Sequence, residues 1–111
     1  MRLYRPPYGE VDQDDVARAM ELGVSPVAWD VDPRDWSRGI SRETIRARVV
    51  DAAEPGSIIL LHDGPGDMRT ATLAALPTII EALRDRGLAS VTVSELIARA
   101  AAVERSMTGS A

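Results

Sequence analysis

Cysteine and phenylalanine are absent from this chain of 111 residues, and histidine occurs only once. Without cysteine there can be no disulfides, no thiolate metal ligands and no cysteine nucleophile, although this absence does not fix the cellular compartment. Aromatic residues make up 4% of the chain and hydrophobic residues 45%, so we expect an aliphatic core. One histidine without cysteine is too few for the usual zinc site built from His and Cys ligands.

Long apolar runs and a basic net charge are also missing. A net charge of −4 argues against a nucleic-acid partner, which favours a basic surface. No apolar stretch is long enough for a transmembrane helix. The first residues lack the apolar core of a signal peptide. We therefore expect no nucleic acid, no transmembrane segment and no signal peptide in this chain.

Short apolar runs alternate with helical periodicity along the whole chain. We expect strands at residues 3–4, 27–29, 57–61 and 91–93, and helices at residues 12–22, 41–53, 70–86 and 94–104. Such alternation predicts parallel strands with right-handed crossovers, in an α/β barrel or an open sheet of about four βα units. No linker divides the chain, so residues 1–105 are expected to form one domain part and residues 106–111 a flexible tail.

Capping residues and apolar stripes refine these helices. Asp12, Ser41 and Ser94 are the expected N-caps of the first, second and fourth helices. The third helix is expected to bury a face formed by Leu73, Leu76, Ile80 and Leu83. Proline inside that helix, at position 77, is expected to kink it or to separate its first turn.

Polar clusters follow the first three predicted strands, at residues 5–9, 30–36 and 62–67, and each precedes a helix. In parallel α/β folds such loops meet at the carboxyl edge of the sheet, where active sites form. Arg5 and Asp32 are 27 residues apart, and so are Asp35 and His62, which is close to one βα unit of roughly 30 residues. We therefore expect Arg5, Asp35 and His62 on one rim.

Each cluster has a structural interpretation when it is taken alone: a tight turn, a solvated loop, or a histidine that is only hydrogen-bonded. Together, on successive strand ends, they favour a site. His62 can donate or accept a proton near neutral pH, and a carboxylate, either Asp35 or Asp63, would orient its ring. The guanidinium of Arg5 can hold a carboxylate through two parallel hydrogen bonds.

Two further features fit acyl transfer to water. Backbone N–H groups in the turn at residues 7–9 can point at a developing oxyanion, and Trp36 offers an apolar wall or a surface on which a sugar can stack. A group that activates the nucleophile and a second proton acceptor are not found among these clusters.

Three segments carry a resemblance to a known family. Arg-Pro-Pro-Tyr-Gly at residues 5–9, Asp-Pro-Arg-Asp-Trp at 32–36 and Leu-Leu-His-Asp at 60–63 resemble the third, fourth and fifth motifs of the NodB-homology polysaccharide deacetylases, also called carbohydrate esterase family 4. The resemblance extends from Arg2 to about Ile97. It implies a hydrolase, dependent on zinc or a similar divalent metal, that removes acetyl groups, usually N-acetyl groups, from peptidoglycan, chitin or related glycans. The implied fold is an irregular (β/α) barrel.

The resemblance also implies a role for each motif residue. His62 is the general acid, Asp35 tunes it, and Arg5 holds the catalytic base. The remaining roles are the oxyanion N–H of Tyr8 and the acetyl pocket lined by Trp36 and Leu60.

The chain departs from the family pattern at its start. The family's first motif, an Asp-Asp pair, and its second, with two metal-binding histidines, should both precede Arg5. The pair Asp14–Asp15 does not replace them, because it follows the first matching motif and lies in a predicted helix. We therefore expect a C-terminal fragment that cannot bind the metal through the family's triad and is inactive alone. Its exposed apolar faces should pair with the missing N-terminal half or cause self-association.

Two alternatives remain open. The chain can be a non-catalytic module that binds a glycan or a partner through Trp36, Tyr8 and Trp29, or one half of a split deacetylase. Its localisation is undetermined, and a cell-wall or extracellular site applies if the full-length protein is exported.

Overall fold

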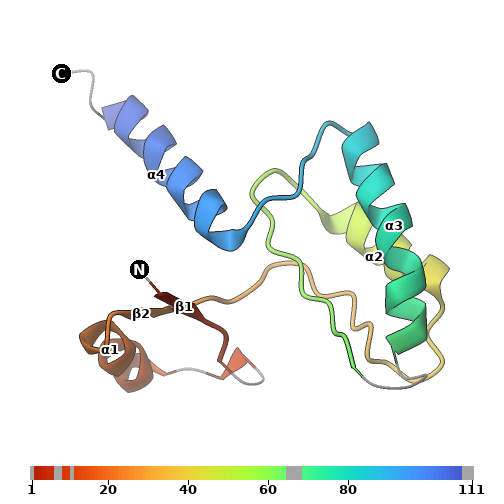
Figure 1. Cartoon of the computed structure of the whole chain (residues 1–111), viewed down its shortest axis with the longest axis horizontal. Coiled ribbons are helices and arrows are strands. Elements are labelled where there is room, and N and C mark those ends of the chain that lie inside the picture. Colours follow the sequence, from red (N-terminus) through yellow and green to blue (C-terminus); the bar gives the residue numbers. More distant parts are fainter. Residues whose placement is uncertain (1, 7–8, 11, 65–68, 109–111) are drawn as a thin grey trace.

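The computed structural model describes residues 2–6, 9–10, 12–64 and 69–108. A helix connects two short parallel strands, and three further helices follow, so the fold class is α/β as predicted (Figure 1). In chain order the elements are β1 Arg2–Tyr4, α1 Gln13–Glu21, β2 Val24–Pro26, α2 Arg42–Ala52, α3 Thr70–Asp85 and α4 Val93–Thr108. None of these helices is both long and apolar enough to cross a membrane.

The strands are fewer and shorter than the sequence predicts. β1 pairs in parallel with β2, with Leu3 opposite Ser25. The predicted strand at 27–29 is wrong in position, since β2 occupies 24–26, and the run at 57–61 contributes an isolated parallel bridge between Val31 and Ile59. The predicted strand at 91–93 is not formed, because α4 begins at Val93. A parallel strand needs ladder hydrogen bonds from its neighbours, and the described residues supply few, so they do not close a barrel.

Helix starts follow their capping chemistry. The side chain of Asp12 accepts from the Asp15 N–H, and Asp15 reciprocates, which completes a capping box at α1. Ser41 accepts from the N–H of Thr44 at the start of α2. Both caps are confirmed.

The fourth helix begins and ends differently from the prediction. The hydroxyl of Thr92, and not Ser94, accepts from the N–H of Glu95 at the start of α4. The helix then extends to Thr108, past the predicted end at Glu104 and into the segment that was predicted as a tail. The helix therefore begins about one residue before its predicted start, a difference within the usual uncertainty of helix boundaries.

The core lies between α2 and α3. Its buried members are Ile45, Val49, Ala53, Ala75, Ile79 and Leu83. The predicted inner face of α3 is partly wrong: Leu83 is buried and Ile80 is half-buried, but Leu73 and Leu76 are exposed. Thr72, Ala75 and Ile79 are buried instead. α3 also runs unbroken through Pro77. A buried hydrogen bond ties Thr72 to Asp35.

Arg86, the C-cap residue of α3, ties the ends of the two helices together. Its guanidinium donates to the carbonyl oxygens of Val50 (2.6 Å) and Ala53 (3.0 Å) at the end of α2. These bonds satisfy carbonyl groups that a helix end leaves without partners. The α2–α3 pair is thus fixed by its apolar core and by polar contacts at its end.

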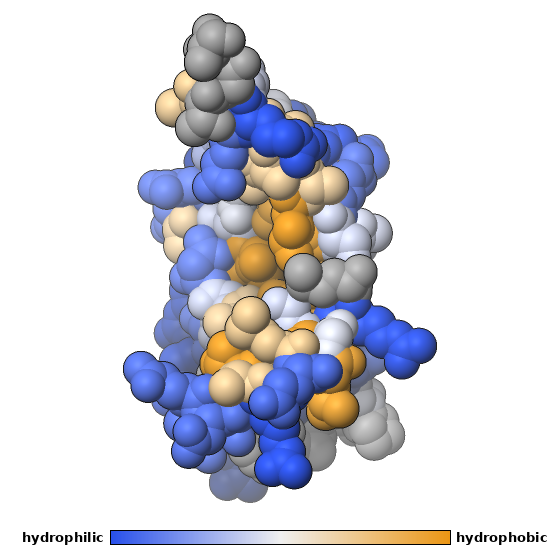
Figure 2. Space-filling model, turned by 90° about the vertical axis from the view of Figure 1, so that its left-hand side faces the viewer, coloured by the Kyte–Doolittle hydropathy of each residue, from blue (hydrophilic) through white to orange (hydrophobic). Residues whose placement is uncertain are grey.

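The molecule is open rather than rounded. Its radius of gyration is 16.5 Å, against about 13 Å for a compact domain of this length. In Figure 1 the α2–α3 pair lies on one side, β1, α1 and β2 form a separate lobe, and α4 stands apart. Figure 2 shows apolar atoms gathered in a band between hydrophilic margins. Exposed apolar faces of this kind mark interaction surfaces.

Candidate active site

Two stretches of extended chain are joined directly before the site. The N–H of Val31 donates to the carbonyl oxygen of Ile58 (3.2 Å), and the N–H of Leu60 donates to that of Val31 (2.9 Å). The carboxylate of Asp30 also accepts from the N–H of Ile58 at 2.5 Å. Because of these bonds, the two segments that follow, which contain Asp35 and His62, run side by side.

The loop after Val31 directs one side chain inward. The carboxylate of Asp32 accepts from the N–H of Arg34 at 2.9 Å, and Arg34 takes a φ of +55°, a left-handed conformation that is uncommon outside glycine. The buried Pro33 is held through its carbonyl oxygen by Arg48 at 3.0 Å. A motif that reads as a plain polar loop is therefore a tight turn, and it delivers Asp35 to the interior.

Asp35 is the centre of the site. The residue is 2% exposed and accepts three hydrogen bonds. They come from the backbone N–H of His62 (2.7 Å), the Nδ1 of its ring (2.7 Å) and the hydroxyl of Thr72 (2.8 Å). The carboxylate that contacts the ring is thus Asp35, whereas Asp63 is exposed.

The charge on Asp35 decides which nitrogen of the His62 ring carries a proton. Burial alone would raise the pKa of Asp35, but the hydrogen bonds from His62 and Thr72 outweigh it, and the net effect is a lowered pKa. An ionised carboxylate only accepts hydrogen bonds, so Nδ1 of His62 carries the shared proton. The Nε2 atom is left for a substrate, on a side chain that is 36% exposed.

The remaining predicted site residues are placed less closely. Trp36 is 47% exposed, with the guanidinium of Arg34 at 5.0 Å from the centre of its ring. Leu60 is half-buried next to Leu61. Tyr8 lies outside the described residues.

Arg5 contacts a residue that the motif pattern does not pair with it. Its guanidinium lies 5.2 Å from the ring centroid of Trp29. The same ring approaches Gly9 so closely that a Cβ there would lie 2.8 Å from it. Arg5 and Leu61, the neighbour of His62, line one pocket. The structure therefore joins Asp35 to His62 directly and places Arg5 on Trp29.

Sequence reasoning missed Thr72. It lies inside an apolar pattern, where a single threonine is usually taken as a tolerated core residue. Its position, one turn before Ala75 on α3, is a signal only once Asp35 is known to be buried. A threonine hydroxyl can satisfy one oxygen of a buried carboxylate.

The described residues do not fit a metal centre of several protein ligands. No group of three or more His, Cys, Asp or Glu side chains comes together among them. The only histidine uses its Nδ1 for Asp35, and Asp15 is used in the cap of α1. A divalent metal would thus need ligands from outside this described part.

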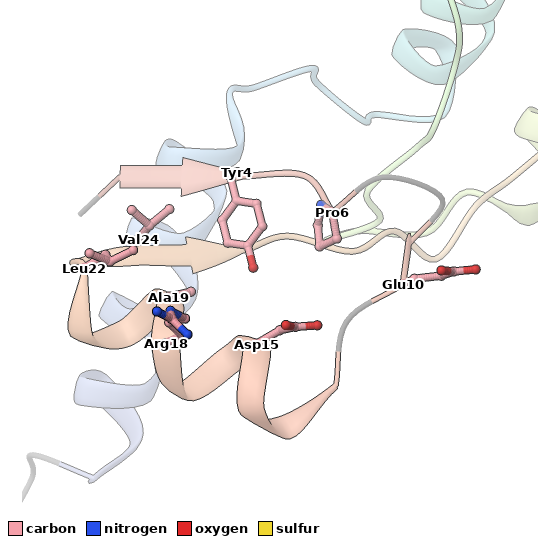
Figure 3. Close-up of a pocket in the computed structure, with 8 residues that line it drawn as sticks. All are labelled: Tyr4, Pro6, Glu10, Asp15, Arg18, Ala19, Leu22 and Val24. Atoms are coloured by element: carbon pink, nitrogen blue, oxygen red, sulfur yellow. The ribbon is translucent and has the colours of Figure 1, made fainter.

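A separate pocket lies between the two-stranded sheet and α1. In Figure 3 the ring of Tyr4 projects from β1 toward α1, near Arg18 and Asp15. The carboxylate of Asp15 already accepts from the N–H of Asp12. This pocket belongs to the N-terminal lobe, and neither Asp35 nor His62 lines it.

No family model matches the chain. Curated relatives nevertheless match most of it. A chitooligosaccharide deacetylase of Rhizobium leguminosarum bv. trifolii is 46% identical over 91 residues, which cover 72% of this chain and 41% of the relative. A peptidoglycan-N-acetylglucosamine deacetylase of Bacillus cereus is 44% identical over 98 residues, or 86% of this chain and 45% of the relative. The chain thus spans less than half the length of these relatives.

Solved structures agree in fold. The crystal structure of a peptidoglycan N-acetylglucosamine deacetylase matches 86% of this chain and 44% of its own, with a TM-score of 0.80 and 37% identity. A family 4 carbohydrate esterase from Streptomyces lividans, in complex with acetate, matches 83% of this chain and 45% of its own, with a TM-score of 0.71 and 37% identity. A pseudoenzyme of the same family from Bacillus anthracis is also similar, with a TM-score of 0.74 and 30% identity over 86% of this chain and 32% of its own.

Proposed function

Because the chain belongs to the NodB-homology polysaccharide deacetylases, carbohydrate esterase family 4, we propose that it forms the proton-donating side of an active site that hydrolyses acetyl groups, most often N-acetyl groups, on a glycan. The share of its relatives that it covers fits a C-terminal part of such a domain. The single observation that carries the proposal is the buried Asp35 that holds Nδ1 of an accessible His62.

The chemistry assigned to this chain is the cleavage step. Water gives a proton to the base that the rest of the domain supplies and adds to the acetyl carbonyl. The C–N bond of the tetrahedral intermediate then breaks, and the leaving nitrogen takes a proton from Nε2 of His62. The products are acetate and a free amine. Asp35 fixes the orientation of the ring, because its carboxylate accepts from Nδ1 of His62 at 2.7 Å. Thr72 keeps that carboxylate in place.

The other motif residues take roles by resemblance to the family. Trp36 and Leu60 line the acetyl pocket, and the N–H of Tyr8 stabilises the oxyanion. Arg5 holds the catalytic base, which the rest of the domain supplies. Support for an apolar pocket wall comes from the exposed ring of Trp36 beside Asp35.

A divalent metal, zinc or similar, is expected of the complete family member and would polarise the acetyl carbonyl. Its ligands are not among the described residues of this chain. The steps given to His62, Asp35 and Thr72 do not pass through it.

The remaining part of such a domain, of which this chain spans less than half, or a second copy of this chain is the expected partner. Apolar side chains of α3, α4 and the 57–61 run line one pocket, among them Ile59, Leu76 and Leu96. We expect the isolated chain to self-associate, which sedimentation velocity would show. A clean monomer with a cooperative melt would contradict this expectation.

A chimera tests the function directly. This chain would replace the 98 matched residues of the Bacillus cereus relative, and acetate release from acetylated glycans would be measured. We expect turnover, and a loss of about 10²- to 10⁴-fold in kcat for His62→Ala, because general acid catalysis contributes about that much.

The matched control is Asp63→Asn, which changes an exposed neighbour of His62. It should keep kcat within about twofold, since surface substitutions away from contacts have small effects. A folded chimera without activity, or near-normal activity of His62→Ala, would overturn the proposal.

A non-catalytic glycan-binding module is the second candidate, favoured by the exposed ring of Trp36. Quenching of tryptophan fluorescence by chitooligosaccharides in the presence of a chelator, together with an inactive chimera, would support it.

A further inference from the structure

Trp29 lies on the stretch of chain that leads out of the lobe of β1, α1 and β2. Two residues before it, the N–H of Val27 donates to the carbonyl oxygen of Tyr4 (2.8 Å) and so continues the pairing of β2 with β1. One residue after it, the N–H of Asp30 donates to the carbonyl oxygen of Ile58 (3.1 Å). The backbone is therefore bonded to the lobe before Trp29 and to a second extended segment after it.

The ring of Trp29 contacts the loop after β1 at two points. The guanidinium of Arg5 lies 5.2 Å from the centre of the ring, within the roughly 6 Å reach of a cation–π contact. A Cβ at Gly9 would lie 2.8 Å from Cη2 of that ring, so this close approach requires glycine. The N–H of Gly9 also donates to the carbonyl oxygen of the buried Pro6 (3.0 Å). Arg5 and Gly9 thus rest against the same side chain.

The contact with Trp29 leaves Arg5 able to bind a carboxylate. An aromatic ring attracts the guanidinium as a whole and does not need a particular N–H donor. The ion pairs among the described residues involve other groups, and none of them includes Arg5. The guanidinium can therefore be oriented by the ring and still give two parallel hydrogen bonds to a carboxylate. A side chain that is held beforehand also loses less entropy when it binds.

The ring holds Arg5 close to the acid side of the site. Arg5 and Leu61, the neighbour of His62, line one pocket. Trp29 itself does not line that pocket. Any effect of the ring on a molecule in the pocket must therefore pass through the residues that the ring contacts.

We propose that Trp29 is a positioning residue of the deacetylase site, which holds Arg5 where it can bind the catalytic base. The inference rests on the proposed function, in which Arg5 holds a base that the rest of the domain supplies. Trp29 acts on the reaction only through Arg5, and it neither binds the glycan nor transfers a proton.

Sugar stacking is the competing interpretation of Trp29. The residue is half-buried, whereas Trp36 is 47% exposed. Because Arg5 and Gly9 already contact its ring, Trp29 offers a sugar less surface than Trp36 does. The two interpretations differ in kinetics: loss of a stacking residue raises KM, whereas loss of a positioning residue lowers kcat.

The chimera that tests the deacetylase function also tests this role. Trp29→Leu should lower kcat about tenfold and leave KM within about threefold, which corresponds to the loss of one cation–π contact. Trp29→Phe keeps an aromatic face and should restore kcat to within about threefold of the unsubstituted chimera. The matched control is Tyr4→Leu, because the ring of Tyr4 projects toward α1, into a pocket that neither Arg5 nor Trp29 lines (Figure 3). It should keep kcat within about twofold.

A double-mutant cycle shows whether Trp29 acts through Arg5. Arg5→Gln removes the cation and should lower kcat more than Trp29→Leu does. Adding Trp29→Leu to Arg5→Gln should then lower kcat by less than about twofold further, because the contact is already lost. Independent losses that multiply would overturn the role. An equal loss in Tyr4→Leu, or a change in KM alone, would overturn it as well.

A measurement without turnover separates this inference from the proposed function. A proton near the face of an aromatic ring resonates at higher field, so in the full 111-residue chain the Nε–H of Arg5 should be shifted upfield. Trp29→Leu should abolish that shift, and Tyr4→Leu should keep it. An unshifted resonance, or one that Trp29→Leu leaves in place, would overturn the role of Trp29 whatever the chimera does. A shifted resonance with a folded but inactive chimera would instead count against the deacetylase function, and with it against a catalytic purpose for the contact.

Discussion

The α2–α3 pair and the lobe of β1, α1 and β2 bury their apolar side chains to different extents. Ile45 and Val49 of α2 are fully buried, and α3 covers them. In the lobe Ala19 is buried, but Met20 and Leu22 on and after α1 are 70% and 75% exposed. One region is a formed core, and the other is a layer with one side open.

The two regions also carry different parts of the proposed chemistry. Asp35 and His62 lie on segments that the α2–α3 core supports. Thr72 of α3 donates to Asp35, and Arg48 of α2 donates to the carbonyl oxygen of Pro33. Arg5 follows β1 in the lobe and contacts Trp29. The proposed proton donor, His62, is therefore held within the packed region, whereas the groups around Arg5 depend on the lobe and on what covers it.

Removing core volume should give the largest effect. Ile45→Ala deletes a side chain that is 0% exposed, and we expect a loss of about 2–5 kcal/mol in the free energy of unfolding, because of the lost burial and the cavity left behind. Urea unfolding followed by circular dichroism measures it. The control is Leu22→Ala in the lobe, expected to change the free energy by less than about 0.5 kcal/mol. Similar losses for both would show that the lobe is packed like the core.

Breaking the buried pair should come next. Asp35→Asn leaves the buried donors of His62 and Thr72 with a weaker acceptor, and we expect a loss of about 1–3 kcal/mol. An asparagine amide can donate to Nδ1, so the ring should move to the tautomer with its proton on Nε2. Nitrogen NMR reads this without ambiguity, because the chain has one histidine. An unchanged tautomer would mean that Asp35 does not set the state of the ring.

Acid should reproduce part of that loss. The folded pKa of Asp35 lies below its ordinary value of 3.8, so its stabilisation is present above that value and is lost as the pH falls through the lower, folded pKa. The difference in unfolding free energy between the wild type and Asp35→Asn should therefore narrow as pH falls below about 4. Urea titrations at several pH values test this, with the exposed Asp63→Asn as a control for a surface carboxylate. A constant difference would contradict the lowered pKa.

The local chemistry of the fold was largely predictable, and the sheet was not. Asp12 and Ser41 cap their helices because short polar side chains satisfy the free N–H groups directly, without help from distant residues. Strands depend on neighbours that sequence periodicity does not supply, so β2 lies earlier than predicted and the 91–93 strand is not formed. The predicted face of α3 was partly wrong, because Leu73 and Leu76 are exposed whereas Thr72, a polar residue that bonds Asp35, is buried.

For the site, loop order and spacing place Asp35 and His62 close together, since successive strand ends share one edge. Their contact at 2.7 Å is a finding of the structure, and their catalytic roles stay predictions. The pairing of Arg5 with Trp29 and the contribution of Thr72 depend on side-chain packing in three dimensions, which no spacing rule encodes.

The smallest effect tests whether the lobe is ordered at all around Arg5. Gly9 has a φ of +70°, and a Cβ there would lie 2.8 Å from the ring of Trp29. Gly39 has a similar φ of +73° with nothing within 4 Å, so Gly39→Ala carries the backbone strain without the clash. We expect about 1 kcal/mol for Gly39→Ala.

Gly9→Ala should change unfolding measured by circular dichroism by no more than Gly39→Ala does, because the lobe contributes little to the core. It should, however, alter the tryptophan emission, since the ring of Trp29 must move. If Gly9→Ala instead destabilised the whole chain well beyond Gly39→Ala, the lobe and the α2–α3 pair would unfold as one unit. The lobe and the α2–α3 pair would then differ only in how much apolar side-chain surface they bury, and Arg5 would be held as firmly as Asp35 and His62.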